Sequence, residues 1–286
     1  MEERLIATAA SASYGPAVLA MLGSLSLNWP DHPRVVVYDI GLDDATRRTL
    51  DDARIEVRQV PSFVPHWRKH FTWKFWVWSD APARDVFYMD AAIIVMRPLE
   101  DVFAAIESTG YFVVPTYGLL SLHASEAACR GCGVEPSFRE GRMTIAGGVV
   151  GFRKEGVIAE VLEQGLELAS TEEHLASTEP LHRHDQAVLS LLLHKHLGQP
   201  VMSDTMIYAG WLSPDQTPGQ AIWTHRRRLQ PADQAHYAAH IGRPGPPHRP
   251  GPPPKPRLVD RVGVRLHELR RRVQKMGPYI YDGVRD

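Results

Sequence analysis

Hydrophobic and polar positions alternate between strand-like and helix-like segments over the first sixty residues. An apolar run at 5–8 precedes a loop of small residues at 9–13 and a helix that Gly15 and Pro16 open. A β-branched run at 34–39, an acid-opened polar helix at 43–52 and a third strand at 54–59 follow. This spacing of strands and helices is typical of a parallel sheet with crossover helices.

The second third of the chain continues the pattern with a tryptophan-rich helix and a long apolar run. Phe71, Phe75 and Trp78 share one helical face in FTWKFWVWSD, and we interpret them as core. The segment VFYMDAAIIVMRPL, at 86–99, predicts a buried strand that contains one carboxylate, Asp90. A helix near 101–107 and a strand at 110–114 come next.

The remainder of the globular region is less regular. Residues 115–142 lack clear periodicity, which is typical either of a binding loop or of a partly disordered segment. A strand at 144–152 contains the glycine pair Gly147 and Gly148, and helices are expected at 155–169 and 186–196.

The C-terminal part changes composition. Residues 241–257, IGRPGPPHRPGPPPKPR, predict an extended linker, because so many prolines and glycines cannot sustain a helix or a sheet. Residues 258–286 predict a basic amphipathic helix and tail, suited either to an anionic membrane surface or acidic partner, or to packing back on the domain. We therefore divide the chain into a domain at 1–240, a linker at 241–257 and a basic tail at 258–286.

Composition limits the class of protein. The 286 residues are 44% apolar and 23% charged, with a net charge of −1, so nothing draws the whole chain to nucleic acid. The uncharged stretch at 5–29 follows two acids and is diluted by serine and glycine, which favours a soluble, cytoplasmic chain over a signal peptide or spanning helix. Cys129 and Cys132 are too few for a zinc site, and we interpret them as reduced thiols.

Candidate chemistry lies at the carboxyl ends of the predicted strands, where open α/β sheets bind ligands. This rule selects residues 8–14, Asp39, Asp90 and the glycine pair at 147–148. Asp90 is suited to a ribose hydroxyl or to Mg²⁺ or Mn²⁺, but Ala92 occupies the place where a second acid would share its face. A buried acid satisfied by backbone amides is the alternative for Asp90, and packing against the sheet is the alternative to base stacking for Tyr14.

Two further charged groups have simpler interpretations. His182, His184, His194 and His196 point in different directions at their spacing, so we do not interpret them as a metal cluster. The run at 226–228 is either a solvated basic face or, beside a diphosphate, a source of an arginine clamp.

Three segments, VVVYDIGLDDATRRTLDD, VFYMDAAIIVMRPLEDVF and HDQAVLSLLL, resemble in their order and spacing those of A-type (GT-A) nucleotide-sugar glycosyltransferases. The resemblance is strongest to the retaining family of glycogenin and the bacterial lipooligosaccharide galactosyltransferases, and it covers about residues 4–230. It implies an α/β fold with a mostly parallel twisted sheet flanked by helices. It also implies a bacterial hexosyltransferase that uses a UDP-sugar and retains the anomeric configuration.

The resemblance assigns roles to individual residues. Asp90 matches the first acid of the family's Asp-x-Asp motif and Ala92 stands in place of the second, while Asp185 and Gln186 match the catalytic pair. His225 matches a late histidine that would join Asp90 in holding a divalent cation, Mn²⁺ or Mg²⁺. Ala146 replaces the amide of the family's Asn-x-Gly turn, and the loop after the first strand lacks the family's usual acid. The expected donor-binding residues are Thr8, Ala9, Ser11, Tyr14, Asp39, Lys74, Asp90, Ala92, Gly147, Gly148 and Arg226.

These assignments predict transfer of a sugar to a glycan, lipid or small-molecule acceptor. Chemistry supports them, because the leaving diphosphate needs positive charge and the oxocarbenium-like anomeric carbon needs nearby oxygen atoms. Asp185 is also a good residue for the start of a helix, which is the simpler reading of that position. Three alternatives remain: a metal-independent transferase of the same fold, a non-catalytic nucleotide-sugar-binding protein, and an interaction protein that acts through its basic tail.

Overall fold

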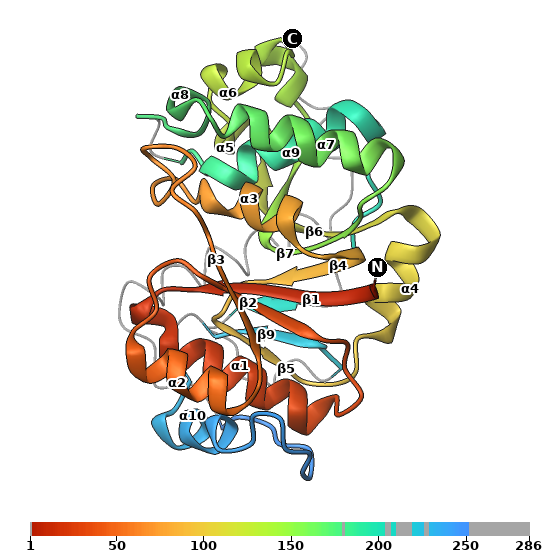
Figure 1. The fold of residues 1–286 in the computed structure, drawn as a ribbon. Helices are drawn as coiled ribbons and strands as arrows, with labels where there is room; N and C mark the ends of the chain where they lie inside the picture. The colour runs from red at the N-terminus through yellow and green to blue at the C-terminus, as the bar shows by residue number, and fades with distance from the viewer. Residues whose placement is uncertain (1, 179–180, 204–206, 210–218, 226–228, 252–286) are drawn as a thin grey trace, which may run out of the picture.

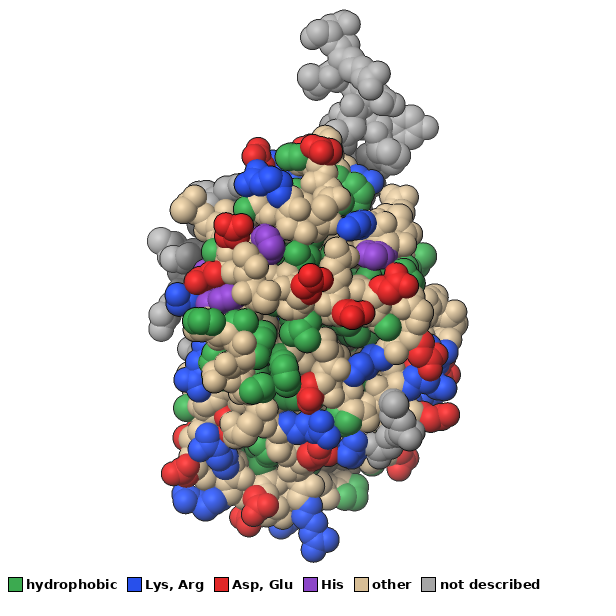
Figure 2. Space-filling model, turned by 45° about the horizontal axis from the view of Figure 1, so that its top comes forward, with side chains coloured by type: hydrophobic (Ala, Val, Ile, Leu, Met, Phe, Trp, Pro, Cys, Tyr) green, Lys and Arg blue, Asp and Glu red, His purple; other side chains and the backbone are tan. Residues whose placement is uncertain are grey.

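The computed structural model describes residues 2–178, 181–203, 207–209, 219–225 and 229–251. The predicted tail at 258–286 and Arg226 lie outside the described residues. Of the predicted linker, residues 241–251 contain no helix or strand. Acidic and basic side chains are interspersed over the face in Figure 2, in agreement with the near-neutral net charge.

The main sheet has six strands in the order β3-β2-β1-β4-β7-β6 (Figure 1). The first four strands run parallel, and β7 runs antiparallel to both β4 and β6. The α/β class with a mostly parallel sheet is therefore confirmed. The strands are β1 (Glu2–Ala10), β2 (Val35–Asp39), β3 (Glu56–Gln59), β4 (Ala83–Met89), β6 (Tyr111–Leu119) and β7 (Met143–Arg153).

Helices cover both faces of this sheet (Figure 1). The principal ones are α1 (Gly15–Asn28), α2 (Asp44–Asp52), α3 (Trp73–Asp80), α4 (Glu100–Thr109), α7 (Gly156–Leu168), α9 (His184–Leu197) and α10 (Pro231–Ala238). Shorter ones are η1 (Ala12–Tyr14), α5 (Leu120–His123), α6 (Glu126–Gly131), η2 (Pro136–Arg139) and α8 (Glu172–Leu175).

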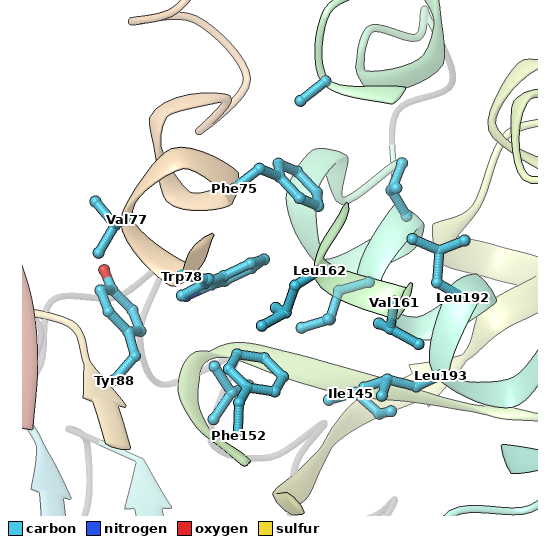
Figure 3. Packing of buried hydrophobic residues seen from close by; sticks show 14 of the residues in the cluster. Phe75, Val77, Trp78, Tyr88, Ile145, Phe152, Val161, Leu162, Leu192 and Leu193 are labelled. Carbon is cyan, nitrogen blue, oxygen red and sulfur yellow. The ribbon is translucent and has the colours of Figure 1, made fainter. Parts of the chain in front are cut away.

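Alternation along the strands divides the core in two. Leu5 and Ala7 of β1 pack in one cluster with α3, α7 and α9, whereas Ile6 packs in a second cluster with α1 and α4. Both faces are buried, which explains why these strands read as nearly continuous apolar runs. In the first cluster Trp78 lies between Tyr88 and Leu162 (Figure 3), with ring centroids of Trp78 and Tyr88 6.0 Å apart.

A second, three-stranded sheet has the order β5-β9-β8 and comprises β5 (Ile93–Val95), β8 (Ile207–Ala209) and β9 (Ile222–Thr224). The single strand predicted over 86–99 is therefore wrong, because the chain leaves the main sheet after Met89 and enters the small one at Ile93. Buried side chains of α1 hold β5 there: Val95 N donates to Ser24 Oγ, and Asn28 Nδ2 donates to the Val95 carbonyl oxygen. Apolar composition alone could not reveal this change of sheet.

Most other predicted elements are confirmed, with local differences. The strand expected at 5–8 runs on to Ala10, so Ala9 belongs to β1 and not to the following loop. Phe71 precedes α3 and is 49% exposed, so it is not part of the core that Phe75 and Trp78 join. The segment at 115–142 contains short helices and the end of β6.

Two further observations concern the whole of the described chain. No helix among these residues combines the length and the apolar character that crossing a membrane requires. Cys129 and Cys132 are free and buried, and burial raises the pKa of the Cys132 thiol to about 12. A protonated thiol at neutral pH is a poor nucleophile and metal ligand.

Candidate active site

Lys74 brings together two of the predicted carboxylates at the carboxyl end of the parallel strands. Its Nζ lies 3.0 Å from Asp90 Oδ1 and 3.2 Å from Asp185 Oδ2. Lys74 comes from α3, Asp90 directly follows β4, and Asp185 lies in the first turn of α9. We call these three residues the charged cluster.

Two hydrogen bonds fix the geometry of this cluster. The Tyr88 hydroxyl donates to Asp90 Oδ1 over 2.7 Å, and Lys74 Nζ donates to the Gly147 carbonyl oxygen over 3.0 Å. Tyr88 and Asp90 are two residues apart, and their contact shows that both lie on the side of the sheet that α3 and α9 cover. The backbone N–H of Asp90 donates to the Gly148 carbonyl oxygen, and this bond fixes the backbone of Asp90 against β7.

The cluster is buried at one end and open at the other. The side chains of Lys74 and Asp185 are 4% and 2% exposed, whereas that of Asp90 is 42% exposed. Burial alone would lower the pKa of Lys74, but Asp185 and Asp90 more than compensate and raise it, so the ammonium stays charged. Burial raises the pKa of Asp185 despite the opposing effect of Lys74, and burial with Asp90 nearby raises that of Tyr88.

Glycines 147 and 148 allow β7 to pass close to the carboxylates. A Cβ on Gly148 would lie 2.4 Å from Asp90 Oδ2. A Cβ on Gly147 would lie 2.6 Å from Asp185 Oδ2 and 2.9 Å from Gln186 Cγ. A side chain at either position would force its neighbour or the strand to shift, so the two glycines allow this close approach. Gln186 lies beside the same strand as Asp185.

His225 reaches the same region through the small sheet. β9 pairs with β5 so that Thr224 opposes Ile93, and the His225 N–H donates to the Ala92 carbonyl oxygen over 3.1 Å. The imidazole is buried, which lowers its pKa to about 4 and keeps it neutral, the form that binds metals.

A divalent cation was expected between Asp90 and His225. The described residues contain no group of three or more histidine, cysteine or acidic side chains placed to hold a metal. Asp90 Oδ1 is already engaged by Tyr88 and Lys74. The donor set therefore fits a cation that a diphosphate shares, since the phosphate oxygens would complete its ligands, better than a cation that the protein retains alone.

The predicted nucleotide-binding residues divide into exposed and buried ones. Ser11 directly precedes η1 and its Oγ lies 3.2 Å from Ser13 Oγ, whereas Tyr14 is the last residue of η1 and is 37% exposed. Thr8 and Ala9 are buried within β1, so their side chains do not face the surface.

The Asp39 carboxylate is occupied by hydrogen bonds within the protein. Its carboxylate accepts hydrogen bonds from the N–H groups of Gly41 and Leu42, from Arg47 Nε and from Gln59 Nε2, all over 2.7 Å. Burial would raise the pKa of Asp39, but these donors, led by Arg47, lower it. The residue is 1% exposed and joins the end of β2 to α2 and β3, an arrangement that leaves little of the carboxylate for a ligand.

The histidines of α9 and the segment before it hold the backbone. His182 Nε2 and His184 Nδ1 each lie 2.9 Å from the Leu175 carbonyl oxygen, and His194 Nε2 lies 2.9 Å from that of Met143. His196 Nε2 lies 2.9 Å from Gln164 Oε1. His182 and His184 therefore converge on one carbonyl oxygen, with ring centroids 5.2 Å apart, and the prediction that they point in different directions is wrong for this pair.

Comparison with known proteins bears on the fold. No family model and no curated protein sequence matches this chain. Among solved structures, the galactosyltransferase LgtC in complex with donor and acceptor sugar analogues is similar at 14% identity, with a TM-score of 0.50 over 83% of this chain and 96% of that one. The chain has the GT-A glycosyltransferase fold. The apo glycosyltransferase GlyE of Streptococcus pneumoniae is similar at 13% identity and a TM-score of 0.52, over 83% of this chain and 60% of that one.

Within this GT-A fold, the sequence identified the charged residues but not two of their neighbours. Tyr88 was covered only by the predicted buried strand at 86–99, although its spacing of two from Asp90 indicates that both side chains share a face. Phe71 was predicted to be core, whereas its ring is exposed and the ring centroid lies 5.2 Å from the buried Lys74 Nζ. Hydrophobicity alone carried no sign of this exposure.

Proposed function

We propose that this chain is a glycosyltransferase that moves a hexose from a UDP-sugar to a hydroxyl group of a glycan, lipid or small-molecule acceptor, with retention. The charged cluster carries the proposal. It places a permanent ammonium and a buried carboxylate together at the strand ends of a GT-A fold, where α/β sheets bind ligands. The resemblance in the sequence supports the choice of UDP and of retention.

In this reaction the bond between the anomeric carbon and the diphosphate oxygen breaks. The acceptor oxygen forms the new glycosidic bond, and its proton leaves with the nucleoside diphosphate. Asp185, fixed by Lys74, and Gln186, beside Gly147, would border the sugar and stabilise positive charge at its anomeric carbon. Lys74 would hold both carboxylates in place and add positive charge towards the leaving group.

Asp90 and His225 are the residues that would hold a divalent cation. The cation would supply Lewis-acid stabilisation of the departing diphosphate. Ala92 provides no carboxylate, so the cation would bind with the donor and not before it.

The first experiment measures thermal unfolding of the full chain with UDP, UDP-glucose and UDP-galactose, each with Mn²⁺ or with EDTA. A ligand at a hundred times its Kd stabilises the folded state by about 2.7 kcal/mol, which shifts the melting temperature by several degrees. GDP-mannose is the matched control and is expected to have no effect. The absence of a shift with every uridine nucleotide would contradict the proposal.

Turnover separates an enzyme from a binding protein. Release of UDP from the UDP-sugar is expected from the wild type, and Asp185→Asn is expected to lower it at least a hundredfold while binding of UDP persists. Binding without release in the wild type would favour the non-catalytic alternative, which the alanines at 92 and 146 also favour. Undiminished turnover in EDTA would contradict the role of the cation.

A further inference from the structure

An exposed aromatic ring lies beside the buried charged cluster. Phe71 is 49% exposed, and the centroid of its ring is 5.2 Å from Lys74 Nζ. It comes from the segment before α3 and not from the hydrophobic core. Exposure of a large aromatic side chain is unfavourable in water, so its place at the edge of this cluster calls for an explanation.

The backbone around this ring is strained. His70 and Phe71 have φ values of +54° and +56°, and His184 has a φ of +33°. Among the described residues only one other non-glycine residue, Arg54, has a positive φ. Each such residue costs on the order of 1–3 kcal/mol and persists where the surroundings enforce it, most often at functional sites.

The strained residues flank both buried members of the cluster. Phe71 lies three positions before Lys74, and His184 directly precedes Asp185. His70 Nε2 lies 3.3 Å from Glu172 Oε1, and His184 Nδ1 lies 2.9 Å from the Leu175 carbonyl oxygen, so contacts with α8 hold both backbones. The same contacts bring the segment before α3 beside α8 and α9 (Figure 1).

Three rings meet as a result. The ring centroids of His70 and His184 are 4.9 Å apart, and those of Phe71 and His184 are 6.3 Å apart. We call His70, Phe71 and His184 the aromatic platform. The rings are not coplanar, because His184 is tilted by 46° from His70 and by 44° from Phe71. The apolar and most exposed part is the Phe71 ring, which lies next to the Lys74 ammonium and the carboxylates that this ammonium binds.

We propose that the aromatic platform binds a pyranose ring, with Phe71 stacked on the apolar face that the ring C–H groups form. A sugar has such a face and also hydroxyl groups, which matches an apolar surface bordered by charged groups. The inference rests on the proposed function and deepens it, because it names the surface that holds a sugar. The pyranose is that of the acceptor or that of the donor, and two measurements distinguish them.

For the acceptor, NMR titration of the UDP-saturated protein with methyl β-D-galactopyranoside and methyl β-D-glucopyranoside gives the affinity for a free pyranose. For the donor, calorimetry compares UDP with UDP-galactose and UDP-glucose. Phe71→Ala is expected to weaken one of these two affinities about tenfold and to leave the affinity for UDP unchanged. Phe71→Trp keeps a stacking surface and is expected to retain binding.

Two variants control for effects on folding. Phe71→Gly suits a positive φ, so it is expected to keep or raise the melting temperature while losing sugar affinity as Phe71→Ala does. Val157→Ala removes an apolar side chain that is 37% exposed in α7 and is expected to change neither affinity.

The outcomes separate the inference from the proposed function. If the wild type binds neither UDP nor UDP-sugars, the proposed function fails. If the wild type binds them but Phe71→Ala and Phe71→Gly bind both kinds of sugar equally well, only the platform is overturned. The platform is also overturned if the Phe71 variants lose as much affinity for UDP without a sugar as they lose for the sugars. It is overturned as well if the wild type neither binds a free pyranose nor binds a UDP-sugar more tightly than UDP.

Discussion

At the scale of single residues, Lys74 holds the site together. Its ammonium pairs with two carboxylates and donates to a backbone carbonyl, although its side chain is almost completely buried. Removal of one partner from a buried ion pair leaves an uncompensated charge, which is the costly case.

We therefore expect Lys74→Met to lower the free energy of unfolding by about 3–5 kcal/mol, measured by urea denaturation. The double variant Lys74→Met, Asp185→Asn is expected to recover part of this loss, because it removes the orphaned carboxylate. Lys69→Met is the matched control, since Lys69 is 65% exposed and its pair with Glu172 is a surface ion pair, which contributes little to stability. Equal effects of Lys69→Met and Lys74→Met would refute this account.

The sequence was informative about these residues only to a degree. The strand-end rule selected Asp90, which the structure places against Lys74, but the same rule also selected Asp39, which Arg47 engages. The difference is set by partners from α2 and β3, including Arg47 and Gln59, which the local sequence of β2 does not show. Residue type and strand position predict where a carboxylate lies, whereas its partners depend on the tertiary fold.

At the scale of elements, β7 is shaped to its neighbours. Its paired glycines let the strand run against Asp90 and Asp185, and the sequence indicated this position through the glycine pair itself. The transition from β4 to β5 was not predictable in the same way. Apolar residues continue across it, and only contacts with α1 and β9 show that the chain changes sheet.

Gly148→Ala tests this close approach. The added methyl group would force Asp90 or the strand to move, so we expect a loss of about 1–3 kcal/mol in unfolding free energy together with weaker binding of UDP. Gly251→Ala is the control, because its Cβ would meet Asp233 Oδ2 at an ordinary 3.6 Å. Urea denaturation and calorimetry measure the two effects, and a Gly148→Ala protein identical to the wild type in both would show that the contact is unimportant.

At the scale of the whole molecule, the buried His225 makes stability depend on pH. Its pKa is about 4 in the folded protein, against an ordinary value of 6.5, because burial disfavours the charged form. Between these values the unfolded chain binds the proton and the folded chain does not, so acidification from pH 6.5 to pH 4 favours unfolding.

The difference between the folded and unfolded pKa of His225 corresponds to a loss of about 3 kcal/mol of unfolding free energy between pH 7 and pH 4. His225→Gln is expected to abolish this loss. Urea denaturation at a series of pH values measures it. His174→Gln is the control and is expected to keep the pH dependence of the wild type. If His225→Gln keeps it as well, the imidazole is not the group responsible.

The charged cluster comes from two distant parts of the chain, 74–90 and 185, and this has a consequence for folding. Lys74, Asp90 and Asp185 come from α3, the end of β4 and α9. The Ala92 carbonyl oxygen, close to Asp90, accepts its hydrogen bond from His225, which follows β9. Such long-range contacts close only after large loops have been ordered, and they slow folding. A nascent chain on the ribosome thus carries Lys74 long before its partner Asp185 has been synthesised, and the charged cluster cannot form until then.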